Sequence, residues 1–231
     1  METQINYETH IIYTEFHKNS KKNALGCLNS LDPTWNALLS SGCSPDTIQL
    51  YEKRYNIKKI QNKKPIDSTK IVSKKCCFYS HFALWNHCVE NNLEFVVVLE
   101  HDTESNIDFP LRKIKDFLAE NTCVGIQLTT KSMLTHLKRY KKYKGHYNSL
   151  VDGVHEIFYV HAFGKRFFAG GTGYVLDLDA CKYLINKVYQ EGWYQNDVMF
   201  SIEDDFPLYF LKPSPVEYLP GKEINSSSFR I

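Results

Sequence analysis

The segment EFVVVLEHDTES, from Glu94 to Ser105, joins an apolar run to a cluster of polar residues. All five residues from Phe95 to Leu99 are apolar, without the alternation of a half-buried strand. Such a run is typical of a strand covered on both faces in a largely parallel sheet. Glu100 and Asp102 follow at once. Because open α/β sheets bind ligands outside the carboxyl ends of their strands, the segment also predicts a site.

The surrounding sequence predicts helices and strands in alternation. Apolar residues recur every three or four positions between Ser73 and Asn92, which favours a helix. A helix beginning at Asp108 and Pro110 follows the strand, and then a second buried strand over 123–128. This order indicates an α/β fold with a mostly parallel sheet flanked by helices. Further elements are expected as strands at 10–16 and 207–211, helices from Ser44 and over 196–205, and a Gly-rich turn, strand and helix within 169–189, capped by Asp177 or Asp179.

Length and composition are those of one folded domain. The 231 residues are 43% hydrophobic and 23% charged, which excludes a disordered chain. A single domain over 1–231 is expected. No apolar run approaches the roughly 18 residues of a membrane span, and Met1 to His10 lacks the apolar core of a signal peptide. We therefore expect a cytoplasmic protein. The net charge of +2 does not by itself favour a polyanionic partner.

Seven cysteines are scattered through the chain, and no C-x-x-C pair occurs. The odd number and the apolar surroundings argue against a zinc cluster or a disulfide framework. We expect these residues to be small buried side chains.

Glu100 and Asp102 form an acid-x-acid pair at the end of the apolar strand. Two such carboxylates can converge on one hard cation, and Mg²⁺ or Mn²⁺ beside a substrate diphosphate is commonly held in this way. The pair therefore suggests nucleotide chemistry. A solvated turn after a strand remains the alternative.

The segment CCFYSHFALWNHCVENNLEFVVVLEHDTE resembles the signature of glycosyltransferase family 25. His101 departs from the pattern, because the family usually has Asp there. GGTGYVLDLDACKYLI, the acidic Asp197 and the closing KPSPVEYLPGKEINSSSFR are similar to later parts of the family pattern. The resemblance spans about 71–230, with a gap at a basic loop. The matching positions in the first segment are Cys77, Ser80, His81, Trp85, Leu99, Glu100 and Asp102.

This resemblance implies a GT-A fold and an enzyme that transfers a hexose, with inversion, from a nucleotide sugar such as a UDP-sugar to an acceptor hydroxyl. Mn²⁺ or Mg²⁺ held by Glu100 and Asp102 would neutralise the leaving diphosphate. Inversion needs a carboxylate base on the opposite face, for which Asp197 is the first choice and Asp204 or Asp205 the alternatives. Expected donor contacts are Ser80, His81, Glu100, His101 and Gln127, and expected acceptor contacts are Gly171, Thr172, Gly173, Lys138 and Arg139. Helix capping, tight turns and structural hydrogen bonds remain alternatives for individual residues.

A long polar segment at about 130–153 contains the basic run KRYKKYKGHY. It is interpreted as a mobile basic loop that closes over donor and acceptor, with a solvated surface as the alternative. Lys and Arg there would also suit the phosphates of a lipooligosaccharide or glycan acceptor, or those of a nucleic acid whose modified base is glycosylated.

Two other classes of protein stay open from the sequence. A degenerate transferase that only binds nucleotide sugars or nucleic acid, without metal, is possible because His101 replaces the usual Asp. A nucleotidyltransferase would share the acid-x-acid pair but would not explain the Ser-His helix and the Gly-Thr-Gly segment together. The oligomeric state is not predicted.

Overall fold

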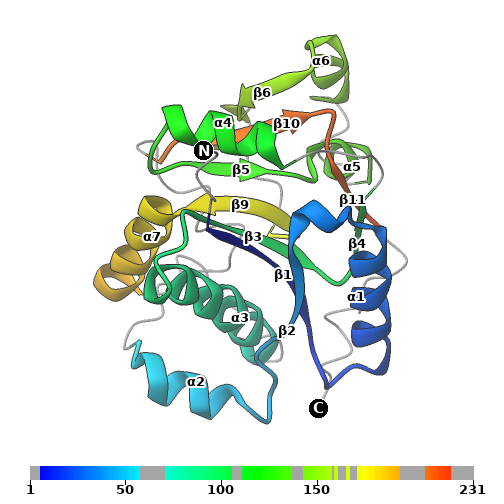
Figure 1. The fold of residues 1–231 in the computed structure, drawn as a ribbon. Helices are drawn as coiled ribbons and strands as arrows, with labels where there is room; N and C mark the ends of the chain where they lie inside the picture. The colour runs from blue at the N-terminus through cyan, green and yellow to red at the C-terminus, as the bar shows by residue number, and fades with distance from the viewer. Residues whose placement is uncertain are drawn as a thin grey trace.

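A seven-stranded sheet forms the centre of the protein in the computed structural model (Figure 1). The structure describes residues 6–57, 71–105, 111–136, 143–157, 159–160, 165–166, 171–192 and 206–219. The elements are β1 (Tyr7–Tyr13), α1 (Lys18–Ser30), a 3₁₀ turn η1 (Pro33–Trp35), β2 (Ala37–Ser41), α2 (Ile48–Tyr55), α3 (Ile71–Glu90), β3 (Phe95–Glu100), β4 (Thr103–Ser105), α4 (Arg112–Glu120), β5 (Gly125–Gln127), α5 (Thr130–His136), α6 (Lys144–Ser149), β6 (Gly153–Glu156), β7 (Tyr159–Val160), β8 (Lys165–Arg166), β9 (Gly173–Asp177), α7 (Leu178–Glu191), β10 (Leu208–Lys212) and β11 (Val216–Tyr218).

The strand order of the main sheet is β2-β1-β3-β9-β5-β10-β6. β9 is antiparallel to both of its neighbours, and β6 is antiparallel to β10. The other five strands run in one direction, so their carboxyl ends meet at one edge. This confirms the prediction of an α/β fold with a mostly parallel sheet flanked by helices. β4 pairs with β11 and β7 pairs with β8 in two small separate ribbons.

β3 is buried on both faces, as its sequence predicts. Val96 and Val98 belong to a core shared with α3 and α7, whereas Val97 and Leu99 belong to a second core shared with α1 and α4. All four side chains have 0% exposure. Figure 1 shows α3 and α7 on one side of the sheet and α1 on the other. The apolar run is therefore explained by helices on both faces.

α3 is buried more widely than one apolar stripe requires. Phe78, Phe82 and Trp85 of the expected apolar stripe are fully buried, and Tyr79 and Leu84 are buried as well. The helix contacts β3, α2 and α7, so side chains that leave it in several directions are covered. The packing on three elements makes α3 the central helix of this face.

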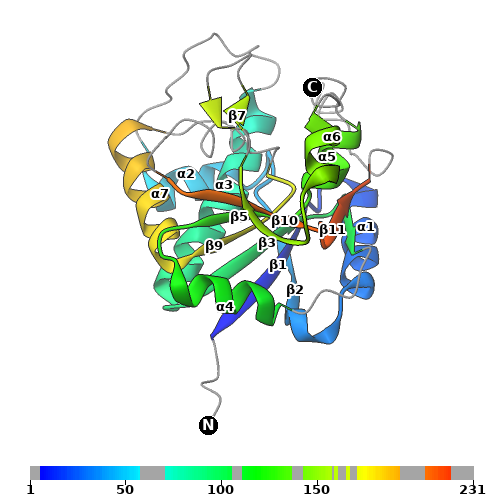
Figure 2. The same cartoon turned by 90° about the horizontal axis from the view of Figure 1, so that it is seen from above.

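Several boundaries differ from the sequence prediction. The first strand is Tyr7–Tyr13 rather than 10–16, because it pairs with β3 from Tyr7 onward. The helix expected from Ser44 begins at Ile48, after a turn in which Thr47 and Ser44 hydrogen-bond to each other. The segment expected to be a basic loop contains α5 and α6. α5 contacts both β11 and α6, as can be followed in Figure 2.

The remaining local predictions are resolved by side chains at the ends of elements. Asp177, not Asp179, caps α7, because its carboxylate accepts from the backbone N of Ala180 at 2.7 Å. All seven cysteines lie in the described ranges, none of them forms a disulfide there, and five of them are buried. None of the helices in the described part of the chain is long and apolar enough to cross a membrane.

Ile126 in β5 tests the central packing. Its side chain is fully buried, so Ile126→Ala should lower the free energy of unfolding by about 2–5 kcal/mol, through lost burial and the cavity left behind. Val151 is 77% exposed, so Val151→Ala should change it by less than about 0.5 kcal/mol. Urea denaturation of both variants checks this, and equal effects would contradict the assigned core.

Candidate active site

Glu100 lies at the carboxyl end of β3, where the parallel strands of the sheet finish. Its backbone N donates to the carbonyl of Thr172 at 2.8 Å, which holds the start of β9 beside it. The hydroxyl of Thr103 donates to the carbonyl of Glu100 at 2.6 Å and closes the following turn. The Glu100 side chain is 24% exposed. A carboxylate thus sits, partly accessible, at the edge where the sequence predicts the site.

A chain of hydrogen bonds leads from the core to this carboxylate. Trp85 Nε1 is 2.9 Å from the Tyr174 hydroxyl, which is 2.8 Å from His81 Nδ1. His81 Nε2 is 3.1 Å from Glu100 Oε1. An indole can only donate, so the Tyr174 oxygen accepts from Trp85. The ionised Glu100 can only accept, so His81 Nε2 donates to it, and the ring with its one proton on Nε2 accepts from the Tyr174 hydroxyl at Nδ1.

The surroundings fix the protonation of the groups in this chain. Burial raises the pKa of Tyr174 well above its ordinary value, so the hydroxyl keeps the proton that it donates. Burial alone would raise the pKa of Glu100, but the hydrogen bond from His81 and the electrostatic interactions with His81 and His101 hold it below its ordinary value. Glu100 is consequently an ionised carboxylate at neutral pH.

Cys77, His81 and Glu100 form a group of possible metal ligands at this edge. Their sulfur, nitrogen and oxygen atoms all lie within 4.8 Å of one another. Cys77 is exposed, and its Sγ is 4.0 Å from Glu100 Oε1. A thiol, an imidazole and a carboxylate in this arrangement are compatible with a divalent cation.

His101 and Asp102 follow Glu100 in the tight turn. Asp102 is 6% exposed, and its carbonyl accepts from Leu219 N at 2.9 Å. It is not part of the three-residue ligand group, and its role as a second metal ligand stays a prediction. Burial lowers the pKa of His101, against the raising effect of Glu100, so its ring is neutral at pH 7. The buried His101 Nε2 has no hydrogen-bond partner among the described residues.

Ser80 connects α3 to the loop after β2. Its hydroxyl donates to the carbonyl of Cys76 at 2.8 Å and accepts from the backbone N of Cys43 at 2.8 Å. A Cβ on Gly42 would lie 2.7 Å from Ser80 Oγ, so this loop approaches the helix closely only because of the glycine. These contacts give Ser80 a structural use, and its expected donor contact stays a prediction.

Thr172, Gly173 and Gln127 are packed at the same edge. The Thr172 and Thr129 hydroxyls are 3.2 Å apart, and a Cβ on Gly173 would lie 2.9 Å from Thr129 Cγ2. The Gln127 side chain is 1% exposed, and its Oε1 accepts from the Thr130 hydroxyl at 3.1 Å. The glycine thus serves close packing of β9, and contacts of these residues with acceptor or donor stay predictions.

Several predicted site residues lie outside the described residues. These are Asp197, Asp204, Asp205, Lys138 and Arg139, together with the expected helix over 196–205 and most of the closing segment.

Tyr174, Trp85 and Cys77 belong to the site but are absent from the predicted donor, acceptor and metal residues. Cys77, His81 and Trp85 are four residues apart, so the sequence alone places them on one face of a helix. This four-residue spacing is the sequence pattern from which Cys77 and Trp85 could have been assigned to the site of His81. The partner on β9 could not be found in this way, because the pairing of Val98 with Tyr174 depends on sheet order.

A mostly parallel sheet with a carboxylate and histidines at its carboxyl edge is typical of α/β proteins that bind their ligands at that edge. The sequence model described as Glycosyltransferase family 25 (LPS biosynthesis protein) matches residues 37–200, more than half of the chain, and the protein belongs to this family. It is a glycosyltransferase. The match begins well before residue 71, where the resemblance was expected to start, and ends before the closing segment.

No curated protein matches the chain. Similar solved structures include core-mannan synthase A from Aspergillus fumigatus in an Mn/GDP form, with 12% identity, a TM-score of 0.48, and coverage of 87% of this chain and 69% of that one. Mouse xyloside xylosyltransferase 1 shows 10% identity, a TM-score of 0.43, and coverage of 84% and 75%. The galactosyltransferase LgtC with donor and acceptor sugar analogs shows 9% identity, a TM-score of 0.41, and coverage of 96% and 93%.

Tyr174→Phe should destabilise the protein by about 1–3 kcal/mol, because it leaves the indole N–H of Trp85 and the Nδ1 of His81 without the oxygen between them. Tyr189→Phe is the matched control, since Tyr189 is 53% exposed, and it should cost less than about 0.5 kcal/mol. Chemical denaturation of both variants measures the difference. A Tyr174→Phe protein as stable as the control would contradict the hydrogen-bond chain.

The lowered pKa of Glu100 predicts an acid-dependent contribution to stability. A glutamate whose pKa falls on folding stabilises the protein above its unfolded value of about 4.3, and this contribution is lost as pH falls through the folded value. The difference in unfolding free energy between wild type and Glu100→Gln should therefore narrow between about pH 5 and pH 2. Denaturation curves across this range test it, and a constant difference would contradict the assigned shift.

Proposed function

We propose that the protein is a metal-dependent, inverting glycosyltransferase that moves a hexose from a nucleotide sugar, in the first place a UDP-sugar, to a hydroxyl of a glycan acceptor. The family membership supports glycosyl transfer. The observation that supports the site is the ionised Glu100 at the carboxyl edge of the sheet, held by a hydrogen bond from His81. A lipooligosaccharide-type glycan is the acceptor class that we favour.

Glu100 and Asp102 hold Mn²⁺ or Mg²⁺ in this proposal. The donor set of the edge fits a divalent cation, because Glu100 is ionised and the neutral His101 has a buried ring nitrogen with no hydrogen-bond partner in the described structure. When bound, the cation neutralises charge that develops on the leaving diphosphate. His81 supports Glu100 from behind, since its Nε2–H fixes the carboxylate, as partners of metal ligands commonly do.

The donor and acceptor approach the edge from different elements in the proposal. We assign the donor contacts to residues on or beside α3, β3 and β5, and the acceptor contacts to residues 171–173 and to two basic residues of the chain between α5 and α6. The proposed donor contacts are Ser80, His81, Glu100, His101 and Gln127, and the proposed acceptor contacts are Gly171, Thr172, Gly173, Lys138 and Arg139. Asp197 is proposed to take the proton from the acceptor hydroxyl, with Asp204 or Asp205 as the alternatives.

A hollow of about 310 Å³ beside α5, α6 and β11 supports the acceptor side of the proposal. Lys131 and Lys144 line it from the two sides of the basic segment, and Tyr147 and Glu217 complete much of its wall. β11 pairs with β4, which follows Asp102 directly in the chain. Cationic and aromatic groups near a sugar site suit an acceptor glycan that carries phosphate or carboxylate. No described feature favours a modified nucleic-acid base.

Calorimetric titration of UDP-glucose, UDP-galactose and other nucleotide sugars, with Mn²⁺ and then with a chelator, tests the donor and the metal together. One donor should bind in the presence of Mn²⁺ and lose its affinity with chelator.

Asp102→Asn should lower kcat by roughly 10²–10³-fold through lost stabilisation of the diphosphate charge. The anomeric configuration of the product, measured by NMR, should be opposite to that of the donor.

Asp179→Asn is the matched control for the charge change, because Asp179 is exposed on α7 and its carboxylate forms a surface ion pair with Lys182. It should leave turnover unchanged. Full turnover in the Asp102→Asn enzyme, or turnover that survives the chelator, would overturn the metal role while leaving transfer intact. A product with retained configuration would overturn inversion.

A further inference from the structure

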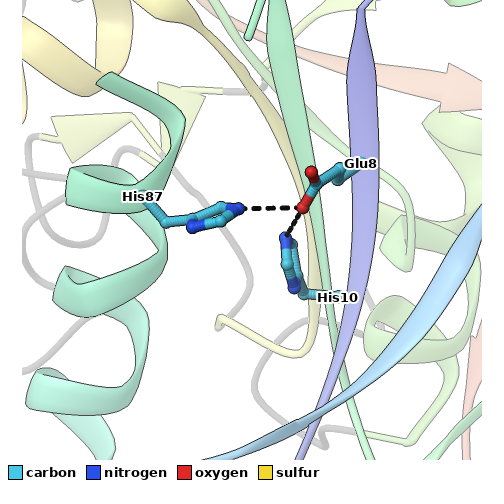
Figure 3. A group of neighbouring side chains, drawn as sticks. All are labelled: Glu8, His10 and His87. Carbon is cyan, nitrogen blue, oxygen red and sulfur yellow. Dashed lines mark hydrogen bonds and ion pairs between the residues drawn. The ribbon is translucent and has the colours of Figure 1, made fainter. Parts of the chain in front are cut away.

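A second cluster of ligating side chains lies on the same face of the sheet as His81. Glu8 and His10 are two residues apart on β1 and therefore point to the same face, and His87 comes from the last turns of α3. Glu8 Oε2 is 2.8 Å from His87 Nε2 and 3.0 Å from His10 Nε2. Figure 3 shows the carboxylate of Glu8 between the two imidazole rings.

This cluster is separate from the proposed active site. Glu8 pairs with Val96 on β3, whereas Glu100 pairs with Ile12, which is four residues further along β1. Four residues of strand correspond to about 13 Å. On α3, His87 lies six residues beyond His81, or about 9 Å along the axis. The two groups therefore occupy different positions along the same helix and sheet.

The donor atoms suit a transition metal better than a hard cation. Two imidazole nitrogens and one carboxylate oxygen lie within 4.8 Å of one another, and this His₂-carboxylate set is common for Zn²⁺ and related ions. Metal–ligand distances of about 2.0–2.2 Å place tetrahedral ligands roughly 3.3 Å apart. The observed contacts would have to open by only about half an ångström, with water in the fourth position.

His10 is already oriented as a ligand. The residue is 5% exposed, and its Nδ1 lies 2.8 Å from the Ser40 hydroxyl on β2, which fixes the ring. Although Nε2 is close to Glu8, the contact is not aligned as a hydrogen bond, and the buried nitrogen has no hydrogen-bond partner in the described part of the chain. A nitrogen that is buried, held in place by a hydrogen bond to the other ring nitrogen, and close to a carboxylate and a second imidazole is suited to a metal site.

We propose that Glu8, His10 and His87 bind one first-row transition-metal ion, with Zn²⁺ as the best fit, and that this ion joins β1 to α3. Access is open, because the Glu8 and His87 side chains are 27% and 36% exposed. The ion would connect the first strand to the central helix, which also contains His81. Mg²⁺ and Ca²⁺ bind poorly here, since they prefer oxygen ligands.

Binding requires one rearrangement, at His87. Asn91 Nδ2 donates both to His87 Nδ1, at 3.0 Å, and to the His87 carbonyl, at 2.9 Å. His87 therefore holds its proton on Nε2 without metal and donates it to Glu8. When the ion takes Nε2, the proton moves to Nδ1 and the exposed amide of Asn91 turns away. A carboxylate at position 91 would accept that proton and should strengthen the site.

Calorimetric titration of Zn²⁺ into the chelator-stripped full chain tests the proposal. Every protein in this comparison carries Cys77→Ser, which removes the thiol from the group Cys77, His81 and Glu100. His87→Gln should weaken Zn²⁺ binding by at least roughly tenfold, because it removes a ligand. Losing even a residue that only hydrogen-bonds to a ligand lowers metal affinity by about 10–100-fold. Zn²⁺ should also raise the melting temperature of the parent by more than that of this variant, in which only the site at the carboxyl edge of the sheet remains to bind metal. Asn91→Asp should tighten binding by about tenfold.

His146→Gln, on exposed α6, is the matched control and should bind Zn²⁺ as the parent does. Melting curves in chelator show whether each variant is folded, and Glu8→Gln provides a second ligand removal with little change of volume. Equal Zn²⁺ affinity and equal thermal stabilisation in the parent, His87→Gln and Glu8→Gln proteins would overturn the site. The measurement needs no enzymatic activity, so its outcome is independent of the proposed transferase reaction.

Discussion

The structure depends on the need to cover β3 on both faces. Val96 and Val98 point into one core and Val97 and Leu99 into the other, so no face of this strand can meet water. Helices must therefore lie on both sides of the sheet, and α3 and α1 occupy these positions (Figure 1). Polar groups can then appear only where the strand ends. Glu100 stands at that end, which ties the place of the chemistry to the burial of the core.

The hydrogen bonds from Trp85 to Glu100 have a direction that follows from donor chemistry. The indole can only donate and the ionised carboxylate can only accept, so with one proton on the His81 ring each proton in the chain points toward Glu100. The chain joins α3, β9 and β3, and it begins at a fully buried tryptophan. A rigid, charged acceptor at the sheet edge is the result, and the binding of a cation or diphosphate would need little reorganisation there.

α3 carries polar groups at two levels along its length. His81 contacts Glu100 near the carboxyl edge of the sheet, and His87 contacts Glu8 near the opposite end of β1. Both contacts fasten the helix to the sheet, and between them lies the apolar packing of Phe82 and Trp85. These two contacts position α3 on the sheet, so the His81 ring stays within hydrogen-bonding distance of Glu100 on β3.

The sequence by itself determined the α/β class, the buried strand before Glu100, the helix with His81 and Trp85, and the family, because these rest on local periodicity and on contiguous motifs. The sequence also placed Glu100 at a strand end. It could not show where the carboxylates of Glu100 and Asp102 point, so their shared metal is a prediction. Only the tertiary structure decided that Tyr174 joins His81 to Trp85 and that Glu8 meets His87. These partners are 79–93 residues apart in sequence, and the order and direction of strands, which bring them together, depend on packing of the whole chain.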